Sequence, residues 1–238
     1  MLFRSDLRVR VGQFFVPFDR ARTISEWGLQ MIDRPLVVSE ATLDRDVGLE
    51  LSSDDLGGLG RLAYRLGIFG GEGKNRLGSR LGFLYVARLQ LNPLGPFDDG
   101  VEGDQDRRPL PRLAVGLAGA YNQNALRQRS TQGANYALDG FDYTHAAADF
   151  TFKWRGLYLF AEALYRRGDL DRREGTVQGS PTREYSRSLW GYVAQAGMML
   201  TQRLEVTARW EQSFALEGTD PALVATLRAQ GQIGRAHV

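Results

Sequence analysis

Apolar and polar residues alternate along most of this chain with a period of two, which predicts β-strands whose two faces differ in polarity. The clearest example lies between residues 81 and 91, where every second residue is apolar and Arg88 and Gln90 stand among the residues between them. Helical periodicity is scarce, so the pattern predicts an all-β fold with an antiparallel sheet. The predicted strands, about nine in number, cover residues 7–12, 46–51, 61–68, 80–91, 112–121, 141–153, 156–166, 188–200 and 203–212.

The lengths of these strands and of their connections favour a transmembrane β-barrel. Soluble strands most often have about 5–6 residues, whereas membrane-spanning strands need about 9–11, the length of most strands predicted here. Short links at residues 153–156 and 200–203 alternate with long polar links at residues 121–140 and 167–187, as turns and external loops do in outer-membrane barrels. The acidic, proline-rich link at residues 92–112 breaks this rhythm, and we interpret it as a flexible excursion. Residues 20–41 are the one helix-like candidate, and we expect them to fold back against the barrel or into it.

Charged residues of the predicted strands mostly fall on the face opposite the aliphatic residues. An arginine on the lipid side of a barrel costs about 2–4 kcal/mol near the bilayer midplane, whereas a water-filled interior tolerates it. A soluble β-sandwich also alternates apolar and polar residues, and this placement of charge favours the barrel over that alternative. The arginines that we predict to line an aqueous pore and to contact anions are Arg8, Arg10, Arg61, Arg65, Arg80, Arg88, Arg166 and Arg209.

Large aromatic residues lie near the ends of the predicted strands. Outer-membrane barrels carry aromatic girdles at both membrane interfaces, and packing at the edge of a sandwich is the alternative interpretation. The residues predicted to form such a girdle are Phe15, Phe18, Phe69, Trp154, Tyr165, Trp190 and Trp210.

The composition narrows the classes of function. The chain has 238 residues, no cysteine and a formal net charge of +2. Without cysteine, disulfides and thiolate metal sites are excluded. No apolar run reaches the roughly 20 residues of a membrane-spanning helix, and Arg4 and Asp6 interrupt any signal-peptide core near Met1. Only Lys74 and Lys153 among the 30 cationic residues are lysines, so permanently charged guanidinium groups dominate.

Four motifs stand out in the first third of the chain: Val11-Gly12-Gln13-Phe14, Val16-Pro17-Phe18, Ile32-Asp33-Arg34 and Arg45-Asp46-Val47-Gly48. With these motifs, roughly residues 7–91 resemble the phosphate-selective porin O and P family of bacterial outer membranes. Weaker echoes of the family follow in "GLYLFAEALYRR" and "GYVAQAGMMLTQRLEVTARWE".

This resemblance implies a barrel of about sixteen antiparallel strands around an aqueous channel. It also implies a homotrimer that contacts outer-membrane lipid and passes anions by diffusion. Known members use lysines together with arginines at their selective sites. Because this chain has almost no lysine, we carry over no phosphate-site residue and expect a general preference for small anions, with phosphate as one candidate.

About nine strands are too few for such a barrel, so we interpret residues 1–232 as a porin barrel fragment, incomplete at both ends. Residues 233–238, "IGRAHV", are interpreted as a non-native tail that resembles a translated sequencing adapter. The missing signal peptide fits the same interpretation, and the expected location is the bacterial outer membrane.

Other chemistry receives little support from the sequence. "GIFGGEGKN" lacks the spacing and the hydroxyl residue of a phosphate-binding loop, and we interpret it as a hairpin tip. His145 shares a strand face with Asp149 and Lys153, and with no second histidine outside the tail we expect neither a metal site nor a hydrolase. The acidic residues of the 92–112 link lack the spacing of a calcium-binding loop and are expected to be solvated.

These patterns lead to a ranked set of functions. The first is a passive, anion-preferring porin with no cofactor, no metal and no nucleic-acid partner. The second is a structural or adhesive barrel with a plugged lumen and loops that bind a surface partner. The third and weakest is a barrel enzyme, since no nucleophile–base pair is evident, and we therefore expect no catalytic residues.

Overall fold

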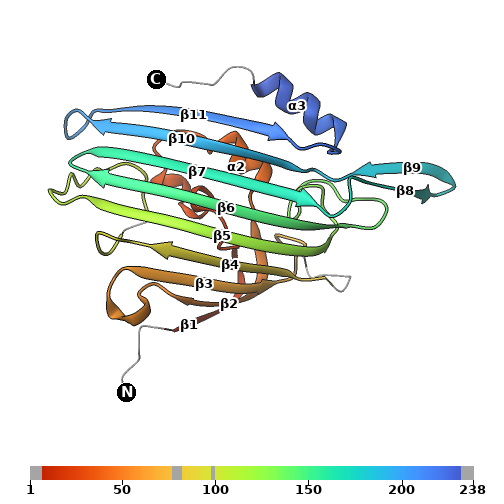
Figure 1. Ribbon diagram of the computed structural model, residues 1–238, viewed down its shortest axis with the longest axis horizontal. Coiled ribbons are helices and arrows are strands. Elements are labelled where there is room, and N and C mark those ends of the chain that lie inside the picture. Colours follow the sequence, from red (N-terminus) through yellow and green to blue (C-terminus); the bar gives the residue numbers. More distant parts are fainter. Residues whose placement is uncertain (1–6, 77–81, 98–99, 232–238) are drawn as a thin grey trace.

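The computed structural model describes residues 7–76, 82–97 and 100–231. Nine strands form one antiparallel sheet in the order β1-β2-β3-β4-β5-β6-β7-β10-β11, and β8 and β9 form a separate two-stranded sheet (Figure 1). The strands of the large sheet are β1 (Arg8–Phe15), β2 (Arg45–Ser53), β3 (Leu62–Phe69), β4 (Leu84–Leu91), β5 (Arg112–Ala125), β6 (Phe141–Trp154), β7 (Leu157–Gly168), β10 (Leu189–Met199) and β11 (Glu205–Ala215). The predicted all-β antiparallel fold is confirmed, and each strand of this sheet overlaps one of the predicted strands.

The two faces of the sheet differ in polarity. In the strand register, Leu66 of β3 lies opposite Leu51 of β2 and Ala87 of β4, so apolar side chains line up across neighbouring strands. We call this side the bare face, because the helical segment between β1 and β2 lies on the other side of the sheet (Figure 1). Its side chains are widely exposed, for example 74% for Val11 and 60% for Leu117. A shift of one residue in the register would exchange the two faces, so the alternation fixes the pairing.

The opposite side, which we call the covered face, packs against residues 16–44, the covering segment. This segment contains α1 (Arg20–Thr23), the 3₁₀ helix η1 (Glu26–Gly28) and α2 (Leu36–Ala41). α2 lies against β7, β10 and β11. The expected return of residues 20–41 onto the sheet is therefore confirmed, although only short helices form within it.

Apolar packing between the covering segment and the covered face forms the main core. Near β1, the rings of Phe14 and Phe69 meet edge to face with centroids 5.3 Å apart. Phe69 lies over Gly48 and Gly67, where the ring occupies the space that a Cβ atom would need. Valines of α2 and residues of β7 and β10 continue the same core, including Val37, Val38, Phe160, Leu164, Leu189 and Val193.

The two ends of the sheet carry connections of different length, except that the long connection between β4 and β5 lies at the end with the short turns. β6 and β7, and likewise β10 and β11, are joined by tight turns at one end, the short-turn end. Long connections after β1, β3, β5 and β7 leave the other end, the long-loop end (Figure 1). The connection after β7 contains β8 (Arg172–Val177) and β9 (Ser180–Tyr185), a hairpin that the sequence analysis treated as loop. The short connection between β2 and β3 contains the 3₁₀ helix η2 (Leu56–Gly58).

The sheet is open within the described residues. β1 pairs only with β2, and β11 pairs only with β10, so both are edge strands. Because β1 and β11 are the first and the ninth strand of an antiparallel sheet, they run in the same direction. Helix α3 (Pro221–Gly231) packs beside β11 and buries Leu223 in the core. No helix among the described residues is long and apolar enough to cross a membrane.

Candidate functional site

The most distinctive feature of the covered face is a buried cluster of charges between the covering segment and the sheet. Arg20, the first residue of α1, donates from Nε to Asp149 Oδ1 over 2.6 Å. Arg88 of β4 donates from Nη2 to the other oxygen of Asp149 over 2.5 Å. The backbone N–H of Arg20 donates to Glu162 Oε1 over 2.6 Å. Both guanidinium groups and both carboxylates are buried, so this cluster ties the covering segment to β4, β6 and β7.

Asp19 holds the start of α1 in place. Its Oδ1 accepts a hydrogen bond from the N–H of Arg22 over 2.7 Å, as expected of an N-cap residue, and its Oδ2 accepts one from the Thr42 hydroxyl. Burial raises the pKa of Asp19 to about 6, despite these hydrogen bonds. Asp19 thus joins the two ends of the covering segment.

A second set of contacts fastens the end of α2. Arg166 of β7 donates from Nη2 to Glu40 Oε1 over 2.9 Å and from Nη1 to the Glu40 carbonyl over 2.6 Å. Arg187 reaches the same carboxylate over 3.0 Å and also pairs with Asp220. Burial alone would raise the pKa of Glu40, but Arg166 and Arg187 outweigh it and hold the pKa below its usual range.

A third set joins the covering segment to the connection between β4 and β5. Arg209 of β11 donates from Nε to Gln195 over 2.7 Å and from Nη1 to the Asp33 carbonyl over 2.6 Å. Glu102 Oε2 accepts hydrogen bonds from the Gln30 N–H and from Gln195 Nε2, each over 2.9 Å. Two segments that enter from opposite ends of the sheet therefore meet on the covered face.

The expectation of a solvated acidic link at residues 92–112 is wrong for two of its residues. Glu102 and Asp104 are buried. Asp104 pairs with Arg112 and accepts a hydrogen bond from the Gly156 N–H. Asp106 is exposed and pairs with Arg108, whereas residues 98 and 99 lie outside the described residues. Folding of this link onto the covered face supplies these acids with donors, which spacing along the chain could not reveal.

The predicted pore arginines divide into three groups. Arg88, Arg166 and Arg209 are buried and anchor the covering segment, so they are not accessible to a dissolved anion in this structure. Arg8 and Arg65 are more exposed and both pair with Asp54.

The third group carries free charge. Arg10 and Arg61 are exposed, and neither forms an ion pair with a described residue; Arg10 lies over the Phe14 ring, 4.1 Å from its centroid. Arg80 lies outside the described residues. The accessible guanidinium groups of the predicted set therefore concentrate on and beside β1 and β3.

Four of the seven residues predicted to form an aromatic girdle lie near strand ends on the bare face, and three do not. Phe15, Trp154 and Trp190 lie at or next to strand ends with bare-face parity, and Tyr165 lies opposite Trp190. Trp190 also stacks on Phe214, with centroids 4.4 Å apart.

The corrections concern three residues. Phe18 and Phe69 are buried in the core of the covered face. Phe69 has the parity of Arg65 and Gly67, so the alternation itself assigns it to the covered face. Trp210 is on the bare face, but β11 extends to Ala215 and places it in the middle of the strand rather than near an end.

The surroundings of His145 are those of a buried side chain. It is buried on the covered face with Asp149 and Lys153, as the alternation predicted. Its Nε2 lies 3.0 Å from the Ser130 hydroxyl, and Phe18 packs edge to face against its ring. Within the described part of the chain, no group of three or more histidine or acidic side chains could hold a metal ion.

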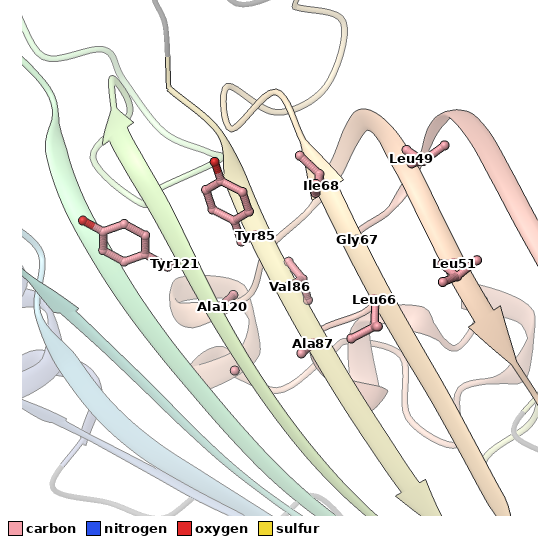
Figure 2. A pocket seen from close by; sticks show the side chains of 11 residues that line it. Leu49, Leu51, Leu66, Gly67, Ile68, Tyr85, Val86, Ala87, Ala120 and Tyr121 are labelled. Atoms are coloured by element: carbon pink, nitrogen blue, oxygen red, sulfur yellow. The ribbon is translucent and has the colours of Figure 1, made fainter. Parts of the chain in front are cut away.

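The bare face carries shallow apolar grooves. Three of these grooves lie over β2–β5, over β4–β7 and over β6–β11, and their linings are almost wholly apolar. The first has a volume of about 550 Å³, and Figure 2 shows Leu49 and Leu51 of β2 on one side of it and Tyr121 of β5 on the other. Small residues such as Ala87 line its bottom, so the groove lies where small side chains stand between larger ones.

Comparison with known proteins finds no matching family model, no matching characterised protein and no matching solved structure. The resemblance to the phosphate-selective porins therefore stays a prediction.

Proposed function

We propose that this chain forms part of the wall of a bacterial outer-membrane β-barrel of the porin type, through which small anions diffuse. The observation that carries the proposal is the reversed polarity of the sheet. A soluble protein rarely exposes an apolar patch of more than a few hundred Å², yet apolar side chains cover the bare face across nine strands. Most charged side chains of the sheet lie instead on the covered face, where many of them pair with one another.

The spacing of the aromatic residues agrees with a membrane-spanning wall. On β7, Leu157 lies opposite Trp154 and Tyr165 lies opposite Trp190. These two levels are eight residues apart, or about 27 Å along the strand at about 3.4 Å per residue. A strand tilt of about 35–45° reduces this to about 20 Å of depth, close to the apolar band of about 25 Å in known barrels.

Barrel closure sets a condition on the strand count. An open edge in the hydrocarbon layer would leave backbone hydrogen-bonding groups unpaired, at a cost of several kcal/mol each. Since β1 and β11 run in the same direction, antiparallel closure takes an odd number of further strands. The barrel of about sixteen strands implied by the family resemblance satisfies this condition.

Anion preference rests on the exposed arginines on and beside β1, an edge strand that pairs only with β2. Arg10 and Arg61 form no ion pair with a described residue, Arg8 pairs with Asp54, and Arg65 pairs with both Asp54 and Glu50. Cationic groups in a confined aqueous path raise the local concentration of anions. Conduction also needs weak binding, which exposed side chains supply better than the buried anchors.

The experiment is a reversal-potential measurement on the protein reconstituted in planar bilayers under a potassium chloride gradient. Anion preference is expected. A channel that prefers potassium would contradict the proposed selectivity while leaving the barrel intact.

A plugged barrel is the second candidate, and the anchoring of the covering segment favours it. The Arg20–Asp149 and Arg166–Glu40 contacts fix this segment across β4–β11, which would narrow or close the adjoining part of a lumen. Membrane insertion without conductance in the same bilayer experiment would favour the plugged barrel over the porin.

A further inference from the structure

Arg45 is a free cation on an otherwise apolar surface. It is the first residue of β2 and lies opposite Phe15, so it shares the bare face with Leu49 and Leu51. It is exposed and forms no ion pair with a described residue, and its guanidinium carbon lies 4.4 Å from the centre of the Phe15 ring. Arg22 lies over the same ring at 5.1 Å, but Asp44 balances its charge over 2.7 Å. The long-loop end of β2 thus presents one unbalanced positive charge beside an aromatic ring.

The apolar groove over β2–β5 begins at Leu49, further along β2 from Arg45. Leu49 is four residues from Arg45, or about 13 Å along the strand. Leu49 and Leu51 form one side of the groove, and Leu66 and Ile68 of β3 continue it toward β4 (Figure 2). The cation Arg45 and one side of the apolar groove therefore lie on the same strand, β2.

The dimensions of this arrangement match one leaflet of a bilayer. Arg45 and Leu51 are separated by six residues, or about 20 Å along the strand. At a tilt of about 35–45° this spans about 15 Å of depth. The hydrocarbon core of a bilayer is about 30 Å thick, so each leaflet contributes about 15 Å.

We propose that Arg45 and the groove bind one anionic phospholipid, with its phosphate at Arg45 and an acyl chain along Leu49, Leu51 and Leu66. A guanidinium group binds phosphate through charge-assisted, often paired hydrogen bonds. The Phe15 ring limits the directions that the Arg45 side chain can take, which leaves its donors in place for the head group. This site rests on the proposed function, because lipid reaches the bare face only in a membrane.

Native mass spectrometry in detergent, with added phosphatidylglycerol or phosphatidylcholine of the same acyl chains, tests the site. The protein is expected to retain one phosphatidylglycerol and to hold phosphatidylcholine about tenfold more weakly. Arg45→Gln is expected to reduce phosphatidylglycerol binding to the phosphatidylcholine level, and Arg45→Lys to retain part of the preference. Ala87→Trp fills the groove and is expected to weaken both lipids.

Arg155→Gln is the matched control, because Arg155 is also exposed and lies over a girdle ring, that of Trp154, at the short-turn end. Its lipid binding is expected to equal that of the wild type. Unchanged phosphatidylglycerol binding by a folded Arg45→Gln protein would overturn the site. An alkaline carbonate wash of membranes separates the two proposals: release of the protein contradicts the membrane wall itself, whereas retention without the lipid preference contradicts the Arg45 site alone.

Discussion

Asp149 forms an ion pair with Arg20 over 2.6 Å and another with Arg88 over 2.5 Å. These two contacts join the covering segment to the middle of the sheet. Gly116 makes this possible, because a Cβ at that position would overlap both Asp149 and Arg88. The Asp149 carboxylate contacts α1 and β4 from β6, alongside the hydrogen bond from Arg20 to Gln90 of β4, so its removal has a predictable cost.

Asp149→Asn is expected to destabilise the folded protein by about 3–5 kcal/mol, because it leaves two buried guanidinium groups without their counter-charge. Urea titration in detergent or lipid vesicles measures the change. Asp54→Asn is the control, since the Asp54 side chain is 43% exposed and its pairs with Arg8 and Arg65 are worth at most about 1 kcal/mol each. Equal costs for the two variants would show that the buried cluster does not hold the covering segment.

The stability of the folded protein is expected to fall as the pH rises from about 4 to about 6 through Asp19. Burial raises the pKa of Asp19 from 3.8 to about 6, so the folded state holds the proton more tightly than the unfolded state. The contribution is fully present below the unfolded pKa and is lost as the pH passes the folded pKa, with an upper bound of about 3 kcal/mol. Urea midpoints across this range, compared with those of Asp19→Asn, measure it; a wild-type profile parallel to that of the variant would contradict the assignment.

Leu117→Arg distinguishes a membrane wall from a soluble sheet. Leu117 and Leu200 are similarly exposed, at 60% and 56%, but Leu117 lies within β5 on the bare face and Leu200 lies in the turn after β10. In a bilayer, Leu117→Arg is expected to cost about 2–4 kcal/mol and Leu200→Arg close to nothing. In a soluble protein both surface changes would stay within about 0.5 kcal/mol. Folding titrations in lipid vesicles separate these outcomes.

Neutralising the free arginines is expected to weaken anion preference without unfolding the protein. The double variant Arg10→Gln, Arg61→Gln removes two charges that form no described ion pair, so the reversal potential in a salt gradient should shift toward zero. Arg203→Gln, in the exposed turn before β11, is the control and should leave the reversal potential unchanged. An unshifted potential in the double variant would remove these two residues from the conduction path.

Local alternation predicted the strands because each strand of the large sheet carries one apolar and one polar face. The same alternation assigns Phe69 to the covered face, and only its position near a strand end suggested a girdle. The β8–β9 hairpin was missed because its strands are short and mostly polar. Its signal was the Gln178-Gly179 pair, where both residues have positive φ and form the turn.

The anchoring contacts could not be predicted, because they join residues far apart in the chain. Arg20 and Asp149 are separated by 129 positions, and nothing near Arg20 distinguishes a buried anchor from a solvated loop residue. The sequence analysis assigned Arg88 to a pore wall because it lies on the polar face, and no residue near it in the chain indicated that it is buried. Whether a residue of that face is buried and paired depends on how the covering segment packs on the sheet, and this packing is a property of the folded chain.

The central claim is that the bare face contacts lipid while the covered face contacts water or protein. Because the chain has no cysteine, single spin labels at Leu66→Cys and Arg65→Cys report on adjacent residues of β3 that point to opposite faces. In reconstituted vesicles, electron paramagnetic resonance should show the label at position 66 accessible to oxygen and protected from a water-soluble nickel chelate, and the label at position 65 should show the reverse. Preferential contact of the position 66 label with the nickel chelate would contradict the membrane-wall account.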